Sequence, residues 1–112
     1  MQMTNPTIYN NAVKLVSDCS VPPHLSGFTF LLEAAIMKSE NYSIKLMDIY
    51  ESLAQNHHST HRAITRSISY AISQSEHIRD YLALSKNDLF NGKVIAMLAL
   101  RLKSMDQMTE EI

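Results

Sequence analysis

Apolar residues recur at helical spacing along most of the chain, whereas residues that break helices are scarce. Side chains at i, i+3, i+4 and i+7 share one face of a helix, and this spacing returns in each segment between polar breaks. The 112 residues include two glycines and three prolines, too few for a turn-rich β-sandwich or barrel. The sequence therefore predicts an all-α fold that is compact and built from about six helices.

The breaks in the pattern divide one expected domain, residues 1–112, into its helices. A chain of this length fits a single domain with one modest core. The expected helices cover residues 5–17, 24–38, 43–56, 60–74, 76–84 and 91–105. Polar residues that can accept a hydrogen bond from a free backbone N–H stand at the expected starts of three of them: Ser43, Ser59 or Thr60, and Asn91.

Composition excludes several classes of protein. The single cysteine, Cys19, allows neither an internal disulfide nor a cysteine-based zinc site, and we expect it to be a small buried residue. No apolar run approaches the roughly 18 residues of a membrane span, and the N-terminus does not resemble a secretory signal. We therefore expect a cytoplasmic protein without a membrane partner. Because no phosphate loop or nucleophile set is recognisable, we expect no enzymatic activity, cofactor or small-molecule substrate.

Histidines cluster near the middle of the chain, and His57 and His61 stand four residues apart. That spacing can direct two ligands to one metal, but zinc needs further ligands, and no Cys, Asp or Glu lies nearby. We therefore expect no metal site. The turn histidines are expected to lie in solvent or beside a phosphate.

Acidic residues are absent between Glu51 and Glu76, although the whole chain has a net charge of −1. This window contains Arg62 and Arg66. A local positive face can therefore lie on a nearly neutral protein. The gap also fits a polar surface that merely lacks acids, and charge alone leaves both interpretations open.

Two expected helices, 43–56 and 60–74, follow each other across a short polar turn. In a helix-turn-helix unit, the first helix braces against the DNA backbone and the second enters the major groove. The second helix here has an outer face of arginine and hydroxyl side chains: Arg62, Thr65, Arg66 and Ser69. This face predicts DNA binding, although ordinary surface helices also carry such residues, and the turn lacks the glycine often found there.

Four further residues are predicted to contact DNA beside this face. Ser59 and Thr60 stand at the start of the second helix, where free backbone N–H groups suit a phosphate oxygen. His61 follows them as a phosphate neighbour. Lys45, at the start of the first helix, is expected to neutralise a phosphate.

Three segments resemble one protein family. Residues 21–28, VPPHLSGF, with LLEAA at 31–35, are similar to V-P-x-H-x-x-G-Y/F and L-R-E-A-I. Residues 49–72 resemble the run L-Y-P-x-I-A and the helix R-V-E-R-A-I-R-H-A-I without a gap, and NGKVIAM at 91–97 is close to N-S-E-F-I-A-M. These patterns are those of the C-terminal DNA-binding domain of the stage zero sporulation protein A, the sporulation response regulator of endospore-forming bacteria.

The resemblance implies six helices with a central helix-turn-helix at about residues 43–74. It also implies sequence-specific binding to double-stranded DNA, transcriptional control linked to sporulation, and paired copies that form a homodimer on tandem sites. The departures lie in the second helix: the family's E-R pair is Thr65-Arg66, an arginine is replaced by Ala63, and Arg62 stands where the family has a small hydroxyl residue. We therefore expect a different target sequence or a lower affinity.

The segment around residues 85–90 is shorter than in the family, and no receiver domain is expected before the helices, so the resemblance does not extend to control by phosphorylation. An alternative function remains open. A helical module that has lost its DNA face could dimerise with a full-length relative and antagonise it. The two functions differ in whether the outer face around Arg66 is exposed or packed.

Overall fold

Six α-helices, one 3-10 turn and no strand make up the part of the chain that the computed structural model describes, which is residues 6–110 with side chains to residue 105. The elements are α1 (Pro6–Asp18), α2 (Ser26–Glu40), α3 (Leu46–Asn56), α4 (His61–Ser73), α5 (Ile78–Tyr81), η1 (Lys86–Asp88) and α6 (Asn91–Glu110). The all-α prediction with six helices is confirmed. The helix expected at 76–84 is a single turn, because the chain turns back directly after Tyr81.

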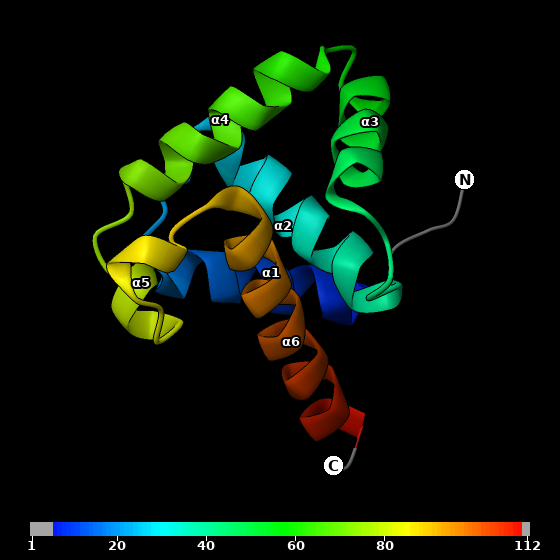
Figure 1. Cartoon of the computed structure of the whole chain (residues 1–112). Coiled ribbons are helices and arrows are strands. Elements are labelled where there is room, and N and C mark those ends of the chain that lie inside the picture. The colour runs from blue at the N-terminus through cyan, green and yellow to red at the C-terminus, as the bar shows by residue number, and fades with distance from the viewer. Residues whose placement is uncertain (1–5, 111–112) are drawn as a thin grey trace.

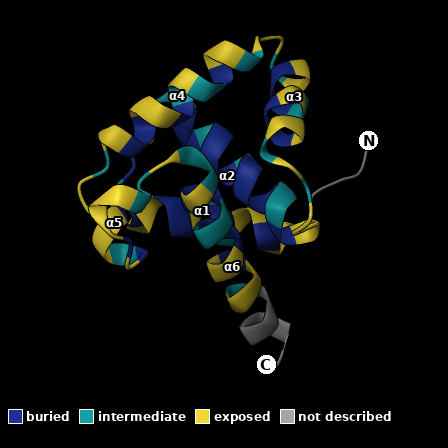
Figure 2. Cartoon of the chain, viewed as in Figure 1, coloured by how far each residue is buried: buried dark blue, intermediate teal, exposed yellow. Residues whose placement is uncertain are grey.

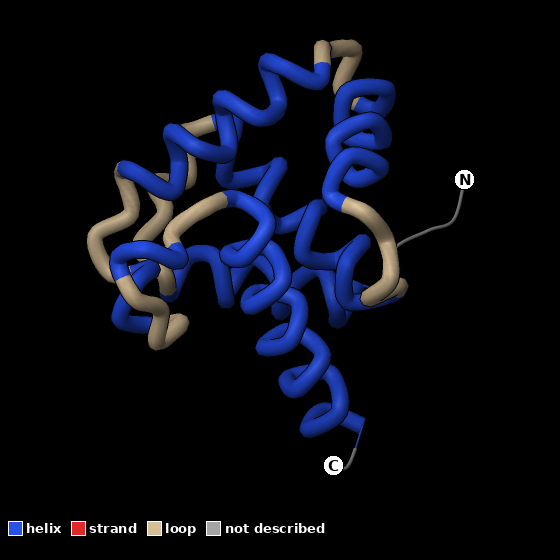
Figure 3. The backbone as a smooth tube through the Cα atoms, viewed as in Figure 1, coloured by secondary structure: helices blue, strands red, loops and turns tan. Residues whose placement is uncertain are grey.

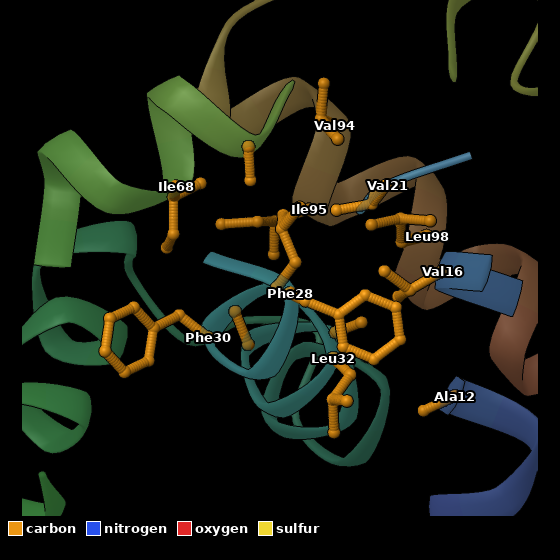
Figure 4. Packing of buried hydrophobic residues seen from close by; sticks show 14 of the residues in the cluster. Ala12, Val16, Val21, Phe28, Phe30, Leu32, Ile68, Val94, Ile95 and Leu98 are labelled. Carbon is orange, nitrogen blue, oxygen red and sulfur yellow. The ribbon is translucent and has the colours of Figure 1, made fainter. Parts of the chain in front are cut away.

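Helix α2 forms the centre of the molecule, and the other long helices pack around it (Figure 1). Its sequence, SGFTFLLEAAIMKSE, is apolar on almost every face, which is typical of a helix buried on all sides. Phe28 projects toward Val16 of α1, whereas Phe30 projects from the opposite side of α2 (Figure 4). Ile68 of α4 and Ile95 of α6 meet above it in the same core.

Helices α3 and α4 meet at a turn formed by residues 57–60 (Figure 3). The predicted cap at Ser43 is wrong: α3 begins at Leu46 after Lys45, and the Ser43 backbone N–H donates to Asn41 Oδ1 at 3.2 Å. The predicted cap at Thr60 is confirmed, because its Oγ1 accepts from the Ala63 N–H at 3.1 Å. The buried residues of α4 form the predicted stripe of Ile64, Ile68, Ala71 and Ile72.

Three helices end in the same pattern, in which a residue other than glycine adopts a left-handed backbone conformation. These residues are Ser20 (φ 66°), His58 (φ 51°) and Ala83 (φ 54°). At the end of α3, the Ser59 N–H donates to Ala54 O at 2.8 Å and the His58 N–H donates to Gln55 O at 3.5 Å. This is the Schellman motif, in which glycine is the favoured residue at the left-handed position.

Replacing His58 with glycine is therefore expected to raise the free energy of unfolding by about 0.5–1 kcal/mol. The exposed imidazole of His58 makes no hydrogen bond within the described residues, so the substitution removes strain without removing a contact. Thermal or urea unfolding measures the change. Ala63→Gly, at an exposed helical position, is the control and should destabilise. Destabilisation by both would show that the turn carries no such strain.

The two glycines lie inside helices instead, each at the second position of its helix: Gly27 in α2 and Gly92 in α6. A Cβ on Gly27 would lie 2.5 Å from the Ala71 Cβ and closer still to the Ser67 carbonyl oxygen. A Cβ on Gly92 would lie 3.2 Å from the Leu46 Cδ2. Gly27 thus allows α4 to lie directly against the backbone of α2.

Candidate nucleic-acid interface

The outer face of α4 is open to solvent along its length (Figure 2). Arg62, Arg66 and Ser69 are all exposed. Within the described residues, neither guanidinium forms a salt bridge with a carboxylate. Both charges are therefore available to an outside partner, since the acid-free stretch of sequence forms this surface.

The exposed face is rotated relative to the predicted one. Thr65 is half-buried at its flank, whereas Tyr70 is 55 % exposed and was missed by the sequence analysis. At 100° per residue, Tyr70 lies about 40° from Arg66, whereas Thr65 lies about 100° away on the other side. The same helical angle could have identified Tyr70. The outer face of α4 therefore consists of Arg62, Arg66, Ser69 and Tyr70.

Two of the predicted DNA-contacting hydroxyls are engaged inside the molecule. Thr65 Oγ1 donates to His61 O at 2.9 Å, one turn earlier in the same helix. Ser69 Oγ donates to Asn91 Oδ1 at 3.1 Å. The arginines are thus the polar groups of the predicted face that have no partner in the described structure.

Asn91 does not cap α6 as predicted, because it is the first residue of the helix and its side chain reaches other helices. Its Nδ2 donates to the Tyr50 hydroxyl at 3.0 Å and to the Thr65 carbonyl oxygen at 3.2 Å. Ser69 completes this cluster from α4. Burial raises the pKa of Tyr50, and hydrogen bonds with the side chains of Asn91 and Thr65 oppose that rise.

The start of α4 presents open backbone donors, with one exception among the predicted residues. The Ser59 N–H is not free, because it donates to Ala54 O at the end of α3. The backbone N–H groups of His61 and Arg62 have no hydrogen bond within the described residues, as is usual in a first helical turn. Ser59 and Thr60 themselves are exposed beside them.

The turn histidines differ from one another. His57 is half-buried, and its Nε2 lies 2.8 Å from Glu33 Oε1 of α2, so the prediction that the turn histidines face solvent or phosphate is wrong for this residue. The His61 ring packs edge-on against Tyr50, with the ring centroids 5.0 Å apart, and its Nε2 is buried. Only His58 of the three is exposed.

Lys45 is exposed at the start of α3. The next residue, Leu46, lies against Gly92 at the start of α6, and Asn91 contacts the middle of α4. Lys45 therefore lies at the end of α3 that is near the start of α6, and the start of α6 in turn contacts α4.

The remaining candidate groups are inert or scattered. Cys19 is fully buried, as predicted, and burial raises the pKa of its thiol to about 12. Within the described residues, no three His, Cys, Asp or Glu side chains gather as a metal would require. No helix in the described part of the chain has the length and apolar character needed to cross a bilayer.

Comparison with known proteins identifies one family. A family model described as the sporulation initiation factor Spo0A C terminal matches residues 12–102, which run from α1 into α6. No curated protein matches the chain. The family is the DNA-binding effector domain of a sporulation regulator and not an enzyme family. With most of its length matched, the chain belongs to the family of Spo0A C-terminal domains.

Proposed function

We propose that the chain is a sequence-specific transcriptional regulator that places α4 in the major groove of double-stranded DNA. In this arrangement α3 braces against the DNA backbone. Arg66 reads a base edge, while Arg62 and Lys45 contact phosphates. Such a role belongs in the cytoplasm, where the chromosome lies.

The observation that supports this function best is a pair of exposed guanidiniums on α4, those of Arg62 and Arg66, which form no salt bridge with the described part of the chain. Exposed arginines four residues apart project from one side of a helix, and a helix of this size fits the major groove. The open N–H groups at the start of α4 provide a phosphate contact at the same edge. Ser59 and Thr60 are exposed beside these groups and could contribute further contacts. Ser69 donates its proton to Asn91, so its hydroxyl could contact DNA only by accepting a hydrogen bond from a base.

Binding to DNA of mixed sequence at several salt concentrations tests this proposal. The logarithm of the association constant is expected to fall linearly with the logarithm of salt concentration, by about 0.9 for each phosphate neutralised. Selection of bound duplexes from a random pool then identifies the target sequence. Absence of binding at micromolar duplex would contradict the proposal and favour the protein-interaction module.

The exposed outer face of α4 also bears on that alternative. A module that uses this face to bind a protein would present two free arginines and Tyr70 to an acidic partner. The occupation of tandem sites by two copies stays a prediction. Sedimentation of the chain on duplexes with one or two sites would measure it.

A further inference from the structure

We propose that Asn91 is a positioning residue that fixes the rotation of α4, and with it the direction in which Arg66 points. The expected effect on DNA binding rests on the proposed function. The positioning role itself stands on the contacts of Asn91 alone. One amide joins three helices: α6, which carries it, α3 through Tyr50, and α4 through Thr65 and Ser69.

The orientation of the Asn91 amide is determined by its partners. The Thr65 carbonyl oxygen can only accept hydrogen bonds, so the amide nitrogen faces it. The second hydrogen on the same nitrogen is donated to the Tyr50 hydroxyl oxygen. The amide oxygen is then turned toward the Ser69 hydroxyl, which donates to it. All three hydrogen bonds depend on one planar group, so the three helices cannot rotate independently without breaking them.

Asn91 stands on a rigid support. Val94, Ile95 and Leu98, in the next two turns of α6, have no exposed surface and lie in the main core. Gly92 packs beside Leu46 at the start of α3. The position of the Asn91 backbone is therefore fixed by the core, and its side chain extends from there to form hydrogen bonds with α4.

Apolar packing alone does not fix the rotation of α4 as closely. The buried face of α4 consists of small and branched apolar side chains against α2, and the hydrophobic effect that buries them is non-directional. Hydrogen bonds do have one. A rotation of about 10° moves a group about 6 Å from the helix axis by about 1 Å, which is enough to break a hydrogen bond to a base.

The test compares Asn91→Ala and Asn91→Asp with the wild-type chain. Residual dipolar couplings of backbone amides report the direction of each helix without DNA. In both variants we expect the couplings of α4 to depart from the frame defined by α1, α2 and α6. Ser75→Ala is the matched control: it removes one hydrogen bond, to the Cys19 carbonyl oxygen, without touching α3 or α6. It should leave α4 in place.

The aspartate variant distinguishes two roles of Asn91: hydrogen bonding to α3 and α4, or a local effect at the start of α6. An acid in the first turn of a helix is favourable, so Asn91→Asp would be harmless if Asn91 served only α6. If the residue bridges, aspartate loses both donors and faces the Thr65 carbonyl oxygen with a negative charge. Aspartate keeps the size of asparagine, so this variant also provides the measurement if Asn91→Ala does not fold.

DNA binding supplies the functional readout. For Asn91→Ala we expect about tenfold weaker binding to the selected duplex, which corresponds to the loss of roughly one well-made base contact. The affinity for random duplex should change less. Unchanged α4 couplings in both Asn91 variants would overturn the inference even if the wild type binds DNA. Shifted couplings in a chain that binds no duplex would leave the positioning role standing and reject the proposed function instead.

Discussion

Replacing Gly27 with alanine is expected to lower the free energy of unfolding by about 3 kcal/mol or more. The new Cβ would collide with the backbone of α4 at Ser67 and with the Ala71 side chain. Backbone atoms cannot move aside as a flexible side chain can, so α4 must shift away from α2. Urea unfolding measures the loss of stability, and weakened duplex binding should accompany it because α4 carries the outer face.

Gly92→Ala is the matched control, because Gly92 also occupies the second position of a helix. Its new Cβ would meet only the end of the Leu46 side chain, at 3.2 Å. Both substitutions gain the same intrinsic preference for alanine in a helix, up to about 1 kcal/mol. We expect Gly92→Ala to be near neutral. Equal losses from the two variants would contradict the assignment of Gly27 as the contact point between α2 and α4.

Replacing Arg66 with alanine is expected to remove most of the preference for the selected duplex, by about 1–3 kcal/mol relative to random duplex. Arg66 is exposed on the outer face of α4 and has no salt bridge to any described residue, so its loss should leave the fold unchanged. Competition between selected and random duplexes at one salt concentration measures the preference, and thermal unfolding checks the fold.

Lys45→Ala serves as the comparison for Arg66→Ala. Lys45 is proposed to neutralise a phosphate, so its loss should weaken binding to all duplexes alike and reduce the salt slope by about 1. If both variants instead weaken every sequence equally, Arg66 does not read a base. The division of roles between the two residues would then be wrong.

The helices themselves could be predicted from the sequence because their apolar spacing is regular. The α4 stripe and the Thr60 cap are local features, decided by residues within a few positions of each other. The start of α3 was misplaced because Ser43 is a good capping residue by type. In the structure Asn41 holds the Ser43 backbone instead.

The candidate site was less predictable because its contacts join distant segments. Asn91 looks like a helix cap in sequence, and only the fold brings Tyr50 and Thr65 to its amide. His57 looks like a surface residue of a turn, but Glu33 of α2 lies beneath it. Gly27 was part of a recognisable motif, yet its role depends on the approach of α4, 40 residues further along.

Both glycines of the chain lie in helices, so none of its connections contains one. Connections without glycine have less backbone freedom to adapt to a partner than glycine-containing loops would have. Part of any misfit with straight B-form DNA is then expected to be absorbed by the duplex. Flexible pyrimidine–purine steps beside the contacted bases should therefore favour binding although no side chain touches them.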